Sequence, residues 1–303
     1  MLVRVLVLLS TQTLAAQFRP VVLLHGLLAE SEAMQHAENW IKQDFPGIYV
    51  LNAKVPTSDK KMDSLFMNLN DQIAALAGVL KNDTHLKDGF NLIGHSQGAL
   101  VTRGYIERYN DPPVHNYISW VGPHAGVYGV PAFNTLCPDV TCPWIDNLVD
   151  DLLTSGASKA TQKLISFAAY WKDPLNMTDY LADNILIADL NNEKATKNPS
   201  YKANIASLNH MALATASKDI VVVPHQSGHF EFFPSGSEAP KDILPLRQSP
   251  WYTEDWLGLR TLDEAGRLTT WEVPCAHSDV PRAVCKEYSY NQVTRDLLNN
   301  TLP

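Results

Sequence analysis

The sequence predicts an α/β fold with a mostly parallel central sheet that is covered by helices on both faces. Short apolar runs of the length of buried strands alternate with stretches whose apolar residues recur at helical spacing. Near-continuous apolar strands that alternate with helices are typical of βαβ units. One apolar run, which begins at Phe90, leads through Gly94-His95-Ser96-Gln97-Gly98 into a helix-compatible segment.

The turn at Ser96 has the form of a nucleophile elbow, in which a serine stands at the apex of a sharp strand-to-helix turn. Gly94 and Gly98 provide the room that this turn needs, because the strand and the helix pack closely around a strained serine backbone. A plain turn is the alternative for Gly-x-Ser-x-Gly alone, since both residue types are common. The preceding strand, the following helix and the upstream His25-Gly26 favour the catalytic interpretation.

Composition narrows the classes of function. With 303 residues, of which 45% are hydrophobic, the chain can bury a large core. A net charge of -8 argues against a nucleic-acid partner, which normally meets a basic face. The sequence has no Gly-rich phosphate loop, metal-ligand cluster or sustained repeat, and so predicts no nucleotide or metal cofactor.

Residues 1–16 are predicted to be a secretory signal peptide. Arg4 precedes an apolar run from Val5 to Leu9, and Ala15 and Ala16 provide a cleavage point before residue 17. A first buried strand is the alternative, but the first strand of the fold is expected later, at residues 19–24. Residues 17–303 are then expected to form one catalytic domain without a membrane span, in a luminal or extracellular space.

The four cysteines form two close pairs, Cys137 with Cys142 and Cys275 with Cys285. Close pairs in an exported chain indicate two local disulfides, although four cysteines permit three connectivities and free buried thiols are the alternative. An exported chain would also make the Asn-x-Thr sequons candidate glycosylation sites. These sequons begin at Asn82, Asn176 and Asn299.

The expected elements follow one another in a regular order. Strands are expected at residues 21–24, 48–51, 90–93, 114–121, 210–216 and 268–273. Helices are expected at residues 32–44, at residues 63–80 and directly after Ser96. The rhythm breaks after Gly122, and strands resume only at residue 210.

The segment from about residue 131 to 208 is predicted to be a helical insertion over the carboxyl edge of the sheet. It contains Pro-containing turns, helix-like stretches at 144–153 and 159–171, and one strand-like run at 185–187. Such an insertion is a common place for an apolar substrate groove.

A serine nucleophile needs a histidine to take its proton and a carboxylate to orient that histidine. In an α/β-hydrolase these residues follow in the order Ser, Asp or Glu, His. Asp219 lies in a short polar turn directly after a strand, and His277 lies in the loop after the last strand. The rival acid, Asp189, lies inside the insertion. His225 and His229 follow Asp219 too closely to be the base and are interpreted as ordinary surface histidines.

The oxyanion of acyl transfer needs two backbone N–H donors. One is expected from Gln97, directly after the nucleophile, and the other from Leu27, in the loop after the first strand. His25 is interpreted as a structural residue of that loop.

Beyond these motifs, the sequence resembles the palmitoyl-protein thioesterases over nearly its whole mature length. This resemblance extends outside the generic esterase motif, which makes it specific. It includes Phe45 to Leu51 (FPGIYVL), Tyr170 to Pro174 (YWKDP), Ala188 to Asn191 (ADLN), Leu257 to Arg260 (LGLR) and Leu262 to Gly266 (LDEAG).

The resemblance implies a lysosomal α/β-hydrolase that removes long fatty acyl groups from the cysteine thiols of S-acylated proteins or peptides. It maps the triad to Ser96, Asp219 and His277, and places a family disulfide at the first cysteine pair. The sequence departs from the family pattern at His95 and in the cysteine pair that flanks His277. Because Gly-His-Ser-Gln-Gly also occurs in lipases, a secreted lipase or carboxylesterase is the alternative function. A non-catalytic binding module with a hydrolase fold is the second.

A palmitate-selective enzyme needs an extended apolar groove, because burial of each CH₂ group contributes about 0.8 kcal/mol. The insertion and the segment after residue 250 are the two candidates for this groove, although core packing is the expected role of at least half of their side chains. The groove candidates are Trp144, Ile145, Leu148, Trp171, Trp251 and Trp256.

Overall fold

The computed structural model describes residues 17–129, 147, 151 and 157–302. Within them a six-stranded sheet has the order β2-β1-β3-β4-β5-β6, and every neighbouring pair of strands is parallel. This arrangement confirms the predicted α/β-hydrolase fold with its parallel central sheet. The strands are β1 (Val21–Leu24), β2 (Val50–Ala53), β3 (Phe90–His95), β4 (Val114–Trp120), β5 (His210–Ala216) and β6 (Leu268–Val273).

All six strands match the expected positions within two residues at either end, and β2 both begins and ends two residues later than expected. The register aligns the strand ends at one edge. Leu24 of β1 pairs with Gly94 of β3, and Trp120 of β4 pairs with both His95 and Ala214. The loops that follow β1, β3, β5 and β6 therefore emerge at the same carboxyl edge, where ligands bind in open α/β sheets.

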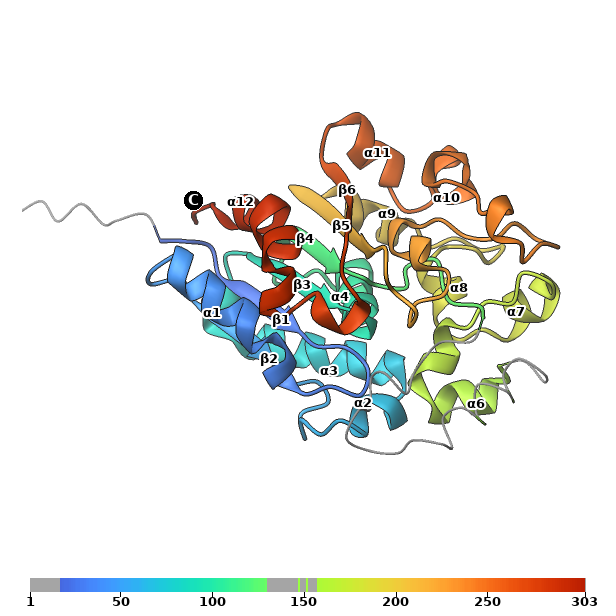
Figure 1. Ribbon diagram of the computed structural model, residues 1–303, viewed down its shortest axis with the longest axis horizontal. Coiled ribbons are helices and arrows are strands. Elements are labelled where there is room, and N and C mark those ends of the chain that lie inside the picture. Colours follow the sequence, from blue (N-terminus) through green and yellow to red (C-terminus); the bar gives the residue numbers. More distant parts are fainter. Residues whose placement is uncertain (1–16, 130–146, 148–150, 152–156, 303) are drawn as a thin grey trace, which may run out of the picture.

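Alternating side chains of the strands bury two apolar cores, one on each face of the sheet. Val22 and Leu24 belong to the core that includes α3 (Leu69–Asn82) and α4 (Gln97–Arg108). Val21 and Leu23 point to the other core, which is shared with α1 (Gln35–Asp44) and α12 (Arg295–Leu298). Figure 1 shows both α1 and α12 on the left of the molecule.

Two of the helices that the sequence predicts differ from the expected single helix. The stretch at 32–44 begins as a 3₁₀ helix, Ser31–Met34, before α1. The stretch at 63–80 is two helices, α2 (Asp63–Phe66) and α3, because the side chain of Asn68 accepts the N–H of Asn70 and starts a new helix.

The described part of the insertion between β4 and β5 is helical, and its first helices lie on the right in Figure 1, while its last one lies beside β5. The strand-like run at 185–187 is not a strand, so that prediction was wrong. Oδ1 of Asn184 accepts hydrogen bonds from the N–H groups of Leu186 and Ala188, so two N–H groups at the start of α8 have a partner outside the helix. The helices are α6 (Lys159–Leu164), a 3₁₀ helix (Ser166–Tyr170), α7 (Met177–Asp183), α8 (Ile187–Leu190) and α9 (Pro199–Ala206).

Helices α10 (Pro250–Thr253) and α11 (Leu259–Glu264) follow β5 and precede β6. After β6 the chain forms 3₁₀ turns at His277–Asp279 and Ala283–Cys285, then a π-helix at Glu287–Thr294 that continues into α12. The remaining 3₁₀ turns are Thr84–Leu86, His225–His229, Pro240–Asp242 and Leu246–Gln248. None of the helices formed by the described residues is long and apolar enough to cross a bilayer.

The predicted helix at 144–153 lies outside the described residues, apart from residues 147 and 151. The signal peptide and the first cysteine pair, Cys137 with Cys142, also lie outside them. The expected limits of the domain and its insertion stay predictions.

Two helical glycines predict opposite effects of the same substitution. A Cβ at Gly98 of α4 would lie 2.2 Å from the carbonyl oxygen of His25, whereas a Cβ at Gly78 of α3 would meet nothing within 4 Å. We expect Gly98→Ala to lower the free energy of unfolding by about 3 kcal/mol or more. Gly78→Ala should raise it by about 0.5–1 kcal/mol, because alanine is the better helix former. Urea unfolding followed by circular dichroism measures both, and stabilisation by Gly98→Ala would contradict the close packing of the elbow.

Candidate active site

Ser96 occupies the turn between β3 and α4, with a backbone φ of 55°. This conformation is rare for a residue with a side chain, and it persists only because the surroundings hold it. A Cβ at Gly94 would lie 2.4 Å from Oγ1 of Thr102, and a Cβ at Gly26 would lie 2.7 Å from Cβ of Ser96. The turn is therefore packed from both sides by backbone that only glycine allows.

The structure brings Ser96, His277 and Asp219 together in one chain of hydrogen bonds. Nε2 of His277 lies 2.8 Å from Oγ of Ser96, and Nδ1 of His277 lies 2.7 Å from Oδ2 of Asp219. All three residues are buried, with 6%, 2% and 8% of their surfaces exposed, respectively. Because Asp219 accepts the Nδ1 proton, Nε2 is left to accept the proton of the serine hydroxyl.

The carboxyl group of Asp219 is held as a carboxylate. Burial would raise the pKa of Asp219, but the neighbouring His277 and two backbone N–H groups outweigh burial and hold this pKa below its usual range. The N–H groups of Val221 and Val222 donate to Oδ1 at 2.8 and 2.9 Å. Asp219 can therefore orient the imidazole while it stays charged.

The rival residues lie elsewhere. Oδ2 of Asp189 accepts hydrogen bonds from Arg108 of α4 and from the hydroxyl of Tyr201 of α9. Nε2 of His225 faces the carboxylate of Glu272, and Nε2 of His229 faces two backbone carbonyls. None of these three rivals contacts Ser96 through a hydrogen bond.

The two expected oxyanion donors both adjoin Ser96. Gln97 is the first residue of α4, and Leu27 lines the cavity that reaches Ser96. Within the described part of the chain, neither backbone N–H donates a hydrogen bond to another residue. His25 is buried in the same loop, where Nδ1 lies 3.0 Å from the carbonyl oxygen of Gly26.

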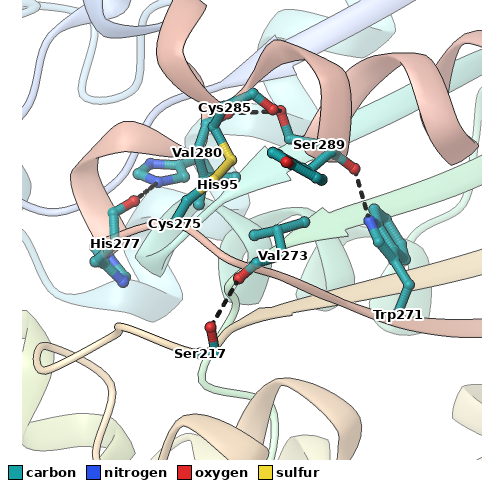
Figure 2. The surroundings of a disulfide bond; sticks show 10 residues. His95, Ser217, Trp271, Val273, Cys275, His277, Val280, Cys285 and Ser289 are labelled. Atoms are coloured by element: carbon teal, nitrogen blue, oxygen red, sulfur yellow. Dashed lines mark hydrogen bonds between the residues drawn. A yellow bond between two sulfur atoms is a disulfide. The ribbon is translucent and has the colours of Figure 1, made fainter.

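Three contacts hold the loop that carries His277. Nε2 of His95 lies 3.2 Å from the carbonyl oxygen of His277, and Figure 2 shows this bond from the elbow to the loop. Beside it, Cys275 and Cys285 form a disulfide. The hydroxyl of Ser289 donates to the carbonyl oxygens of Val280 and Cys285, which fastens the loop to the π-helix. The second cysteine pair is thus a local disulfide, as expected.

His95 is held neutral. Complete burial, together with the positive charge that His277 can carry, lowers the pKa of His95 to about 3. A neutral imidazole can donate one N–H, and Nε2–H is the proton that the carbonyl oxygen of His277 can accept. Nδ1 of His95 has no hydrogen-bond partner among the described residues.

The cavity at Ser96 has mostly apolar walls. Three of its lining residues, Pro123, Val127 and Tyr170, come from the segment after β4, and Val221 and Val222 follow Asp219. The sequence pattern did not identify these five residues as pocket residues. Tyr170 was visible in it only as part of a motif shared with a family.

The described groove candidates do not line this cavity. Trp171 packs against Tyr128, and Trp251 lies over the ammonium group of Lys172. Trp256 stacks on the ammonium group of Lys197. Trp144, Ile145 and Leu148 lie outside the described residues.

All three sequon asparagines, Asn82, Asn176 and Asn299, have exposed side chains. Their glycosylation stays a prediction.

Comparison with known proteins identifies close relatives. The family model described as palmitoyl protein thioesterase matches residues 20–277 of this chain. A Dictyostelium discoideum protein named palmitoyl-protein thioesterase 3 is 42% identical over 279 residues, 92% of each chain. A Caenorhabditis elegans protein named palmitoyl-protein thioesterase 1 is 33% identical over 270 residues, and a Drosophila melanogaster protein named lysosomal thioesterase PPT2 homolog is 30% identical over 269 residues. Each of these two alignments covers 88% of both chains.

Removal of the Cys275–Cys285 disulfide should destabilise the protein. The cysteines are 10 residues apart, and closure of a loop of this length stabilises by roughly 2–3 kcal/mol in the chain-entropy model. We expect a Cys275→Ser/Cys285→Ser variant to lose about this free energy of unfolding in urea. Non-reducing peptide mapping is the companion measurement, and two free thiols in the wild-type protein would refute the prediction.

The buried neutral His95 predicts a specific pH dependence. Its pKa is about 3 in the folded chain, against roughly 6.5 in an unfolded chain. Between these pH values only the unfolded state binds the proton. The free energy of unfolding is therefore largest above the unfolded pKa and decreases as the pH falls toward the folded pKa. His95→Asn should remove this loss, and wild type should weaken relative to the variant by about 1.4 kcal/mol per pH unit. Urea unfolding of both proteins at pH 7, 6 and 5 tests this, and a constant difference between them would contradict it.

Proposed function

This chain belongs to the palmitoyl protein thioesterase family, and from that premise we propose that it removes long-chain fatty acyl groups from the cysteine thiols of S-acylated proteins or peptides. The family membership makes it a thioesterase. The observation that best supports the proposed mechanism is the chain of hydrogen bonds from Asp219 through His277 to Ser96. That arrangement is what a serine needs to become a nucleophile near neutral pH.

In the proposed acylation step, Oγ of Ser96 attacks the carbonyl carbon of the thioester while its proton passes to Nε2 of His277. Asp219 stabilises the imidazolium that forms. The tetrahedral intermediate then collapses, its carbon–sulfur bond breaks, and His277 returns the proton to the departing cysteine sulfur. The fatty acyl group is left as an ester on Ser96.

In the deacylation step, a water gives a proton to Nε2 of His277 and attacks the acyl carbon. The second tetrahedral intermediate breaks the bond to Oγ of Ser96, and His277 returns the proton to the serine. The fatty acid leaves and the free hydroxyl is restored. In both steps the N–H groups of Leu27 and Gln97 would stabilise the negative oxygen.

The walls of the cavity support an acyl substrate. Val127, Val221 and Val222 surround the space next to Ser96 with apolar surface, which favours the carbons adjoining the carbonyl. The extended groove for the rest of a long chain stays a proposal for the insertion, which includes Ile145 and Leu148.

The location proposed for the protein is the lysosome or the extracellular space. One relative at 30% identity carries the word lysosomal in its name. The low pKa of the Asp219 carboxyl is compatible with an acidic compartment, because a carboxylate must persist there to orient His277.

The nucleophile assignment predicts that Ser96→Ala abolishes turnover of a palmitoyl thioester. The expected loss of kcat is about 10⁴-fold or more, since a triad acts as a unit. Hydrolysis measured with a chromogenic thiol reagent gives the rate, and circular dichroism checks the fold. Ser217→Ala is a matched control, because Ser217 is a nearby serine outside the hydrogen-bonded chain. Wild-type turnover by Ser96→Ala would exclude this mechanism.

A second measurement separates the thioesterase from a lipase or carboxylesterase. Matched S-acyl and O-acyl substrates of several chain lengths should be compared with wild-type protein. We expect a preference for the thioester and for long chains. A strong preference for the oxygen ester would favour the lipase alternative, and no labelling of Ser96 by an active-site serine probe would favour a binding module.

A further inference from the structure

We propose that Ser64 is a positioning residue that holds both backbone donors of the oxyanion site, and this inference rests on the function proposed above. Ser64 lies in α2, a four-residue helix, and only 1% of its surface is exposed. It belongs neither to the elbow nor to the loop after β1. Nothing in the pattern of the sequence distinguishes it from other serines.

The side chain of Ser64 holds the loop that contains Leu27. Its Oγ accepts the N–H of Leu28 at 2.8 Å and donates to the carbonyl oxygen of Lys61 at 2.7 Å. Leu28 has a φ of 53°, in the left-handed region that a leucine rarely adopts. Because the hydroxyl satisfies a buried N–H of that strained residue, it compensates part of the cost of the conformation.

The geometry of the chain transmits this constraint to the proposed donor. The peptide plane that carries the N–H of Leu28 is the next one after the plane that carries the N–H of Leu27, and each plane is rigid. On its other side the loop is confined at Gly26, whose absent Cβ would lie 2.7 Å from Cβ of Ser96. The direction of the Leu27 N–H is therefore constrained on both sides, by Gly26 before it and by Leu28 after it.

The backbone of Ser64 holds the second donor residue. Its carbonyl oxygen accepts a hydrogen bond of 2.9 Å from Nε2 of Gln97. The other end of the Gln97 amide, Oε1, accepts the hydroxyls of Ser166 and Tyr170 at 2.8 and 3.3 Å. The Gln97 side chain is thus fixed between α2 and the insertion, while its backbone N–H faces the site at the start of α4.

Helix α2 is itself fixed by the helix that follows it. Nε2 of Gln72 in α3 donates to the carbonyl oxygens of Ser64 and Met67 at 2.9 and 2.8 Å. These bonds tie the carbonyls at the end of a four-residue helix to α3. One buried serine therefore connects Leu28 and Gln97 to a rigid part of the fold.

The test is the Ser64→Ala variant of the full chain, which removes the hydroxyl and leaves the backbone carbonyl. We expect kcat for a palmitoyl thioester to fall about 10- to 100-fold with little change in KM, because a misaligned donor weakens only the transition state. Ser249→Ala is the matched control. Ser249 is fully buried, and its hydroxyl also donates to a backbone carbonyl, that of Leu246. It should lose similar stability and no activity.

A ligand pair separates positioning from a general structural role. A long-chain trifluoromethyl ketone reacts with Ser96 to form a tetrahedral adduct: Oγ bonds to the ketone carbon, the hydroxyl proton passes to Nε2 of His277, and the former carbonyl oxygen becomes a negative oxygen at the oxyanion site. Its inhibition constant should rise by the factor by which kcat/KM falls. The inhibition constant of 1-dodecanol, which lacks a carbonyl, should not change.

A conservative variant covers the case in which Ser64→Ala does not fold. Ser64→Cys keeps a side chain of similar shape but offers a weaker acceptor, so it should show a smaller loss of kcat than alanine. Wild-type kcat in Ser64→Ala, or in Ser64→Cys if alanine does not fold, would overturn the inference. Equal weakening of both ligands would overturn it too. Failure of the proposed function is distinguishable, because wild-type protein would then not hydrolyse the palmitoyl thioester, or Ser96→Ala would keep its turnover.

Discussion

The hydrogen bond of 2.8 Å between His277 and Ser96 joins two residues that are 181 positions apart, and much of the fold serves to hold its two ends. One end is fixed by β3 and α4, which hold Ser96 at a φ of 55°. The other end lies on a loop after β6, which the disulfide closes and which the bond from His95 fastens to the elbow. The parallel register brings both ends to one edge of the sheet.

Burial makes this arrangement electrostatically demanding. A buried carboxylate is costly unless it is paired and hydrogen-bonded. Asp219 meets both conditions, through His277 on one oxygen and two backbone N–H groups on the other. These two N–H groups belong to Val221 and Val222, and both residues also line the cavity at Ser96. The bonds that keep the acid charged therefore also position the wall against which we propose that the acyl carbons lie.

The sequence predicted most of the sheet and the identity of the residues at its edge, because those features depend on local patterns. Apolar runs marked the strands, and Gly94 and Gly98 marked the elbow. The rest depends on contacts between distant segments or on side chains that compete with propensity. The side chain of Asn184 accepts a backbone N–H where the sequence suggested a strand. The hydroxyl of Ser64 accepts the N–H of Leu28, which is 36 residues away. A bond such as that from His95 to the carbonyl of His277 is specified only once the two segments meet, so no local pattern predicts it.

Trapping of the covalent intermediate directly tests whether Ser96 is the nucleophile that carries the acyl group. Wild-type protein would be mixed with a palmitoyl thioester, quenched in acid within the first turnovers and digested for mass spectrometry. We expect a palmitoyl ester on the peptide that contains Ser96, with a burst of thiol no larger than one per enzyme. Steady release of thiol with the palmitoyl group on another residue, or on none, would contradict it.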